Sequence, residues 1–231
     1  MELETCARRY YYTHVFPVPF GSERMEEAQD YGSAVHAWIE GGMKGDPPRP
    51  EGAGEGARGR APGGGFSASE YALRASSYPL REGRNLSDGG PARMVEVPFA
   101  VEVGGAEVRG RIDAVFLDED GTVHLIDWKT GRPRESYAER LQLPLYALAA
   151  NRLWGVEPKR MRLAYVFVPG GEEVGVETGE GFLEGAEERV LRALGRIRAG
   201  EYEPRPSAYA CSHCPVIGVG IEGCPKEVPE A

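Results

Sequence analysis

Three alternating runs in the middle of the chain constrain the fold more than any other feature. Residues 95–103 alternate apolar side chains with polar or small ones, and residues 107–117 and 122–129 form two further strand-like runs. Alternation with a period of two is typical of a half-buried β-strand. The glycine pair at 104–105 and the DEDG sequence at 118–121 supply tight turns between the runs. We therefore predict three consecutive antiparallel strands.

The flanking sequence favours helices packed on this sheet. Residues 24–43, 139–155 and 184–202 have helical patterns, and residues 161–169 form an apolar run typical of a buried strand. Pro144 requires that the second helix either begins close to it or kinks there. Together these elements predict an α/β fold with a central mixed sheet flanked by helices.

Length and composition favour one domain over residues 1–231, because 231 residues with 41% hydrophobic content can bury one substantial core. Residues 45–65, rich in Gly, Pro and Arg, and residues 76–92 are expected to be flexible insertions. The sequence has no apolar run of about 18 residues and no signal peptide, so we expect a cytoplasmic protein without membrane attachment. The net charge of −9 argues against general adhesion to nucleic acid.

The chemistry is concentrated at the end of the third strand. Period two puts Asp127 and Lys129 on one face, and Asp113 on the preceding strand converges on them if the strands pair through the short turn. Two adjacent carboxylates repel each other unless a cation neutralises them, which indicates either strain or a site for Mg²⁺ or Mn²⁺. A lysine beside such a metal orients water or neutralises phosphate charge. The simpler alternative is an ordinary Asp–Lys surface pair.

The sequences GRIDAVF, HLIDWKTG and QLPLYALAA together resemble the nuclease domain of the RecB family in the PD-(D/E)xK superfamily. The resemblance implies that Asp113 and Asp127 bind the metal and that Lys129 serves catalysis. It also implies that Gln142 and Tyr146, spaced i and i+4 on one helix face, help to handle DNA.

The same resemblance extends to YGSAVHAWIE, and it implies that His36 is a metal ligand. Glu96 falls where relatives often carry a further acid, although Glu102 competes for that role. We consider four arginines as candidates for phosphate contacts. They are Arg8, Arg9, Arg132 and Arg134.

The activity implied by the resemblance is a metal-dependent DNA exonuclease acting on single-stranded ends in recombination or double-strand-break repair, alongside a helicase subunit or domain. Two alternatives stay open. One is a nuclease that processes CRISPR spacers, which the neighbouring genes would distinguish from a repair enzyme. The other is a non-catalytic DNA-binding or assembly module, which would be expected to lack part of the acid, acid and lysine set.

Four cysteines form the second candidate site. Cys211 and Cys214 have C-x₂-C spacing, Cys224 follows, and Cys6 lies near the start of the chain. The spacing suits either tetrahedral zinc, with His213 as a further possible ligand, or an iron-sulfur cluster. The arrangement resembles that of iron-sulfur members of the family, including AddB-type subunits and CRISPR adaptation nucleases. The resemblance implies a 4Fe-4S cluster on these four cysteines, which would join the two ends of the chain.

Overall fold

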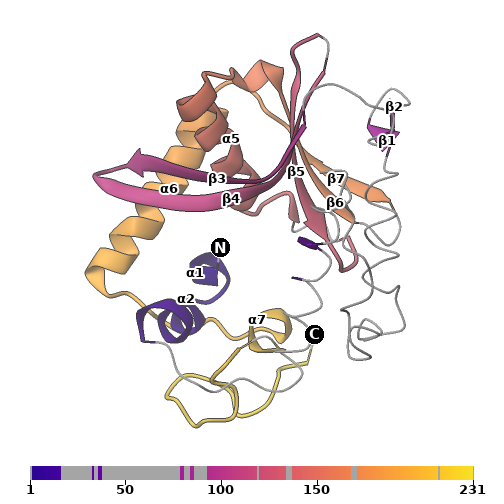
Figure 1. Cartoon of the computed structure of the whole chain (residues 1–231). Helices are drawn as coiled ribbons and strands as arrows, with labels where there is room; N and C mark the ends of the chain where they lie inside the picture. The colour runs from indigo at the N-terminus through magenta and orange to yellow at the C-terminus, as the bar shows by residue number, and fades with distance from the viewer. Residues whose placement is uncertain are drawn as a thin grey trace. The chain divides into compact units, whose positions relative to one another are not determined.

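The structure is a computed structural model, shown in Figure 1. It forms two compact units. Unit 1 comprises Met1–Glu27 and Glu188–Ala231, and unit 2 comprises Ala28–Glu187. The residues that the structure describes are 2–16, 33, 36–37, 79–80, 84–85, 93–118, 120–133, 137–167, 171–212 and 214–230. The predicted insertion at 45–65 lies outside these residues, and the one at 76–92 is described only at β1 (Pro79–Leu80) and β2 (Arg84–Asn85).

Unit 2 is built on a five-stranded sheet with the order β3-β4-β5-β6-β7. The strands are β3 (Arg93–Val103), β4 (Ala106–Leu117), β5 (Val123–Lys129), β6 (Met161–Phe167) and β7 (Glu172–Val176). The first three pair antiparallel in sequence order, which confirms the predicted meander. Gly104 and Gly105 both have positive φ, as a two-residue hairpin turn requires. Strand β7 was not predicted, because its sequence, EEVGV, has only weak apolar alternation.

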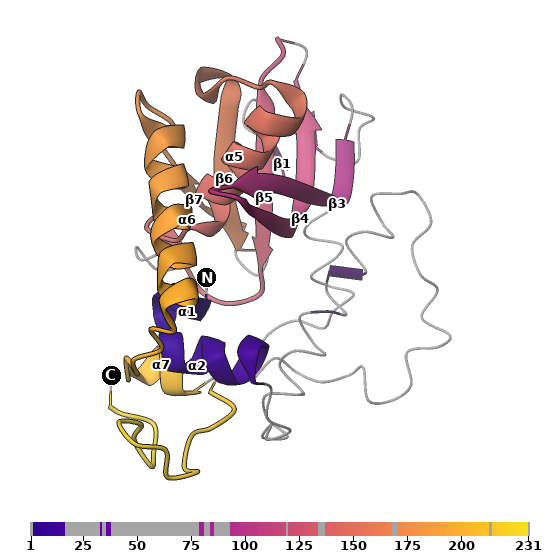
Figure 2. The same ribbon diagram turned by 90° about the vertical axis from the view of Figure 1, so that its left-hand side faces the viewer.

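A helix connects β5 to β6, which pair in parallel. This helix, α5 (Gln142–Trp154), places Pro144 in its first turn, where the missing N–H has no intrahelical partner to lose. A single 3-10 turn, η5 (Pro158–Arg160), leads into β6. Helix α5 lies against the sheet (Figures 1 and 2) and contributes Leu143 to a core that includes Ile112, Leu125, Tyr165 and Phe167. The mixed sheet with adjoining helices confirms the predicted α/β fold.

Unit 1 is helical wherever it has regular structure among its described residues. It contains α1 (Glu2–Thr5), α2 (Ala7–Tyr10), the π-helical turn η1 (Tyr11–Val15) and α7 (Ala208–Ser212). It also contains most of α6 (Phe182–Ala199), because the boundary between the units falls inside this helix. Tyr202 stacks on Tyr10 and contacts Tyr11, which ties the two chain segments of the unit together.

Most of the helix predicted at 24–43 lies outside the described residues, and Ser33, His36 and Ala37 are its helical positions within them. In the part of the chain that the structure describes, no helix is long and apolar enough to cross a membrane.

Candidate active site

The pairing of β4 with β5 brings the two predicted metal-binding carboxylates together. The register pairs Ala114 with Ile126, so the next step of the ladder sets Asp113 opposite Asp127. The Trp128 N–H donates to Asp113 Oδ2 at 2.9 Å. The Tyr146 hydroxyl lies 3.2 Å from Asp127 Oδ1 and 3.5 Å from Asp113 Oδ1. The two acids are therefore neighbours in a buried pocket of polar groups rather than surface residues.

Burial and repulsion raise the pKa of Asp113 to about 7. Desolvation is the larger cause and the negative charge of Asp127 is the second, whereas His36, Lys129 and the Trp128 N–H oppose the rise. At neutral pH this carboxyl group therefore keeps a proton for much of the time unless a cation replaces it. A divalent ion would relieve both causes, so the pair fits a metal ion chemically.

A third acid and the predicted histidine complete this group. His36 Nδ1 lies 3.1 Å from Glu96 Oε1 and 3.8 Å from Asp113 Oδ2. Ligand atoms of all three residues lie within 4.8 Å of one another, close enough to share one metal ion. The predicted ligand Asp127 lies outside this group, because its Oδ2 pairs with Lys129 and its Oδ1 is next to the Tyr146 hydroxyl. One nitrogen and several carboxylate oxygens suit Mg²⁺ or Mn²⁺.

Of the two glutamates, the structure places Glu96 beside the other acids. Glu96 lies on β3 opposite Asp113, between the pairs Val95–Ala114 and Val97–Ile112. Its φ of +50° is in the left-handed region, which costs a non-glycine residue about 1–3 kcal/mol and is found most often at functional sites. The sequence held a signal that could have identified Glu96. Once the turn at 104–105 sets the register of β3 and β4, residue 96 falls opposite residue 113.

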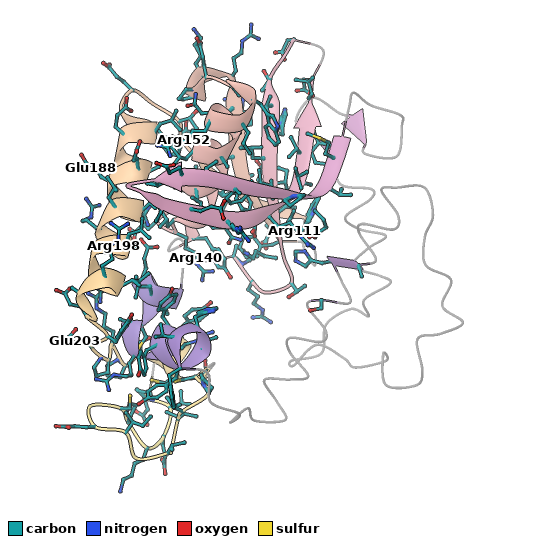
Figure 3. All side chains as sticks on the ribbon, turned by 60° about the vertical axis from the view of Figure 1, so that its left-hand side comes forward. Arg111, Arg140, Arg152, Glu188, Arg198 and Glu203 are labelled. Atoms are coloured by element: carbon teal, nitrogen blue, oxygen red, sulfur yellow. The ribbon has the colours of Figure 1, made fainter. Side chains whose placement is uncertain are left out.

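Glu102, the competing glutamate, is exposed near the other end of β3, where its backbone lies opposite that of Glu107 on β4. Arg111, labelled in Figure 3, reaches Glu96 Oε2 with its Nη1 at 3.4 Å. This guanidinium adds a positive charge at the outer side of the acid group.

Lys129 is held on three sides. Its ammonium group forms an ion pair with Asp127 Oδ2, donates to Gln142 Oε1 at 3.2 Å and lies 5.4 Å from the centre of the Tyr165 ring. Gln142 Nε2 in turn donates to the Tyr146 hydroxyl at 3.1 Å. A closed chain of polar contacts therefore runs from Lys129 through Gln142 and Tyr146 to Asp127.

Tyr146 is a buried residue, and desolvation together with the nearby carboxylates raises its pKa, so its hydroxyl stays protonated and can donate. From this position Gln142 and Tyr146 orient the lysine and the carboxylate. All the residues that the sequence assigned to the active centre are thus brought together, and Glu96 joins them.

Residues 1–219 match the PD-(D/E)XK nuclease superfamily. The chain belongs to this superfamily. It is 31% identical over 130 residues to the Gene 69 protein of Mycobacterium phage L5 and 30% identical over 134 residues to that of phage D29. These regions cover 54% and 56% of the chain but only 43% and 47% of the phage proteins, so the chain spans under half the length of these curated relatives.

A similar fold occurs in the crystal structure of SSO0001, with a TM-score of 0.50 and 18% sequence identity. The match covers 96% of this chain and 83% of that one. At this level of identity the likeness concerns the fold alone.

The candidate arginines lie in different settings. The Arg8 Nε donates to the Tyr202 carbonyl at 2.8 Å, which gives this residue a structural contact within unit 1. Arg9 contributes to the lining of the cysteine cavity described below, and Arg132 is exposed. Arg134 lies outside the described residues.

The four cysteines line a single small cavity in unit 1, together with Arg9. Cys6 Sγ accepts the Arg205 N–H at 3.3 Å, the kind of contact that stabilises a metal-bound sulfur. Burial raises the pKa of Cys214 and Cys224, so their thiols stay protonated unless a metal takes the proton's place. The set therefore fits a thiolate-bound metal group. His213, the other possible zinc ligand, lies outside the described residues.

Proposed function

We propose that this chain is a metal-dependent deoxyribonuclease that hydrolyses phosphodiester bonds by in-line attack of water. The observation that carries the proposal is the pair of facing carboxylates, Asp113 and Asp127, with Lys129 held beside them. The superfamily assignment supports the reaction class.

The proposed ligands of Mg²⁺ or Mn²⁺ are His36, Asp113 and Asp127, with Glu96 as an addition from the structure. A bound ion would stabilise the charge that develops on the phosphoryl oxygens and favour ionisation of water. Lys129 presents a fixed positive charge and N–H donors to the attacking water or to a phosphate oxygen. Gln142 and Tyr146 keep that ammonium group and the Asp127 carboxylate in place.

The finer assignment is a DNA exonuclease that acts on single-stranded ends in recombination or double-strand-break repair, in the cytoplasm and alongside a helicase subunit or domain. We treat residues 1–231 as one nuclease domain, because the superfamily match runs through both compact units. The complete acid, acid, lysine, glutamine and tyrosine set supports the RecB-type assignment. It also weighs against a non-catalytic DNA-binding or assembly module. CRISPR spacer processing uses the same chemistry and stays the alternative role.

We further propose that Cys6, Cys211, Cys214 and Cys224 hold a 4Fe-4S cluster of the type found in AddB-type relatives. The four cysteines line one cavity, which supports a shared metal group, and the resemblance to iron-sulfur members of the family favours the cluster over tetrahedral zinc. An anaerobically purified sample should be coloured and contain iron, whereas a colourless sample with stoichiometric zinc would overturn the assignment.

The experiment for the nuclease uses single- and double-stranded DNA labelled separately at each end, incubated with Mg²⁺ or Mn²⁺. Release of label should require the metal and should fall by about 10²–10³ in Lys129→Ala, the range expected when one preorganised donor is removed. Lys159→Ala is the control, because Lys159 is an exposed lysine paired only with Glu157. Intact DNA in the presence of folded, metal-loaded protein would refute the catalytic assignment.

A further inference from the structure

Unit 1 contains a hollow of about 290 Å³ lined by arginines that play no part in the site described above. Arg189, Arg192 and Arg196 project into it from α6, and Arg205 lines it from the segment that follows the helix. Glu4 of α1 also lines it. We call this hollow the arginine pocket.

The charges of the arginine pocket do not balance. Four guanidinium groups and one carboxylate line it, an excess of three positive charges in a chain whose net charge is −9. Glu4 Oε1 accepts from Arg189 Nη2 at 2.9 Å, which neutralises one arginine. Arg192 reaches Glu188 only at 3.5 Å, and both side chains are about two-thirds exposed, so that pair contributes little. Like charges gathered in a hollow focus a positive potential that an anion would relieve.

The spacing of the helical arginines makes a row rather than a scattered patch. At about 100° per residue, positions 189, 192 and 196 fall within an arc of about 60°. Seven residues of helix extend about 10 Å, so the row is long enough to meet more than one phosphate of a strand. Arg198, labelled in Figure 3, lies about 180° around the helix from Arg189.

We propose that the arginine pocket binds the phosphate backbone of a DNA strand, without regard to base sequence. Guanidinium groups match phosphate oxygens in a two-point geometry, and a row of them follows a chain of phosphates better than a single anion. The inference rests on the proposed function for its ligand, since that function supplies DNA as the substrate. It uses none of the residues of the acid site, so the two can be tested separately.

The experiment is a binding titration of the full chain with a fluorescently labelled single-stranded oligonucleotide, in EDTA and over a series of salt concentrations. The double variant Arg192→Gln/Arg196→Gln should weaken binding about tenfold or more at low salt. Losing two phosphate contacts should also reduce the slope of log K against log salt by about 1.4 for a single strand. The loss should be equal for oligonucleotides of different sequence.

Two further variants make the result specific to the pocket. Arg198→Gln/Lys226→Gln removes the same charge from unit 1 at exposed positions outside the pocket, and its salt slope should change less. Arg205→Gln, which does not perturb the helix, should reduce the slope by about 0.7. Equal effects from the pocket and control pairs, or an unchanged slope in both pocket variants, would overturn the inference.

Failure of the proposed function would look different from failure of this inference. EDTA prevents cleavage, so the binding titration reports on the arginine pocket whether or not the acid site is catalytic. Pocket-dependent binding without any nuclease activity would leave the inference standing and refute only the catalysis. Nuclease activity with pocket-independent binding would refute the inference alone.

Discussion

The acid site and the cysteine site are built by opposite means. Asp113, Asp127 and Lys129 sit on adjacent strands of the sheet, whose backbone ladder fixes their register without any ligand. Cys6 and the cysteines of 211–224 belong to opposite ends of the chain, and no strand joins them in the described part of unit 1. We therefore expect the sheet to keep its site when the metal ion is removed, whereas unit 1 should lose order if the proposed cluster is lost.

Removal of one cluster ligand should give the largest effect and should be confined to unit 1. Cys211→Ala is expected to lower the free energy of unfolding of this unit by about 4 kcal/mol. A ligand present at about 1,000 times its dissociation constant stabilises the folded state by this amount, and the variant would lose it. Hydrogen exchange should accelerate at α7 and residues 214–230 but not in β4 and β5. Ser212→Ala, a neighbouring exposed position, is the control. Equal acceleration of hydrogen exchange in both units would show that the effect is not confined to unit 1.

Removal of Glu96 should lower metal affinity without unfolding the sheet. Glu96→Gln keeps the shape of the side chain but removes one anionic ligand, and we expect the affinity for Mn²⁺ to fall about 10- to 100-fold. Titration calorimetry measures the change, with Glu102→Gln as the matched control on the same strand. If the two variants behaved alike, Glu96 would not belong to the metal site.

The pH dependence of the metal-free protein should reflect the raised pKa of Asp113. Its folded pKa of about 7 exceeds the ordinary value of 3.8, so between these values the folded state holds more protons than the unfolded state. Stability from this group therefore falls as pH rises from about 4 to about 7, and a divalent ion should reverse the loss. Thermal unfolding in EDTA at several pH values measures how stability changes with pH, and Asp113→Asn should remove the contribution of this carboxyl group to that slope. A wild-type slope in Asp113→Asn would contradict the assignment.

Removal of the Tyr146 hydroxyl should have the smallest effect. Tyr146→Phe keeps the buried ring and deletes the donor to Asp127, so we expect a cost of about 1 kcal/mol in stability, typical of one hydrogen bond. The rate of cleavage should fall about tenfold while DNA affinity stays constant, because the residue is buried. A loss of affinity with an unchanged rate would instead indicate direct contact with the strand.

The sequence predicts where Asp113, Asp127 and Lys129 lie on the sheet, because the pairing of their strands follows from local rules. Period two and two short turns suffice to place Asp113 beside Asp127 and Lys129. Glu96 was ambiguous because Glu102 lies on the same strand, and the two are told apart only when the register sets residue 96 opposite residue 113. Strand β7 escaped prediction because its pairing with β6, rather than its own composition, stabilises it.

The arginine pocket escaped prediction for a related reason. Arg189, Arg192 and Arg196 are visible as a helical stripe, but Arg205 and Glu4 join them only through tertiary structure. The cysteine spacing likewise indicates a metal group. Spacing alone does not distinguish zinc from an iron-sulfur cluster, because that distinction depends on the distances between the sulfurs.

The proposed divalent-ion site should already be formed in the metal-free sheet. Electron paramagnetic resonance of Mn²⁺ titrated into the protein measures this binding, with Asp113→Asn beside the wild type and Glu102→Gln as the control. We predict loss of the free Mn²⁺ signal in proportion to wild-type and control protein, and retention of that signal with Asp113→Asn. Equal binding by all three proteins, or no binding by folded wild type, would contradict the account.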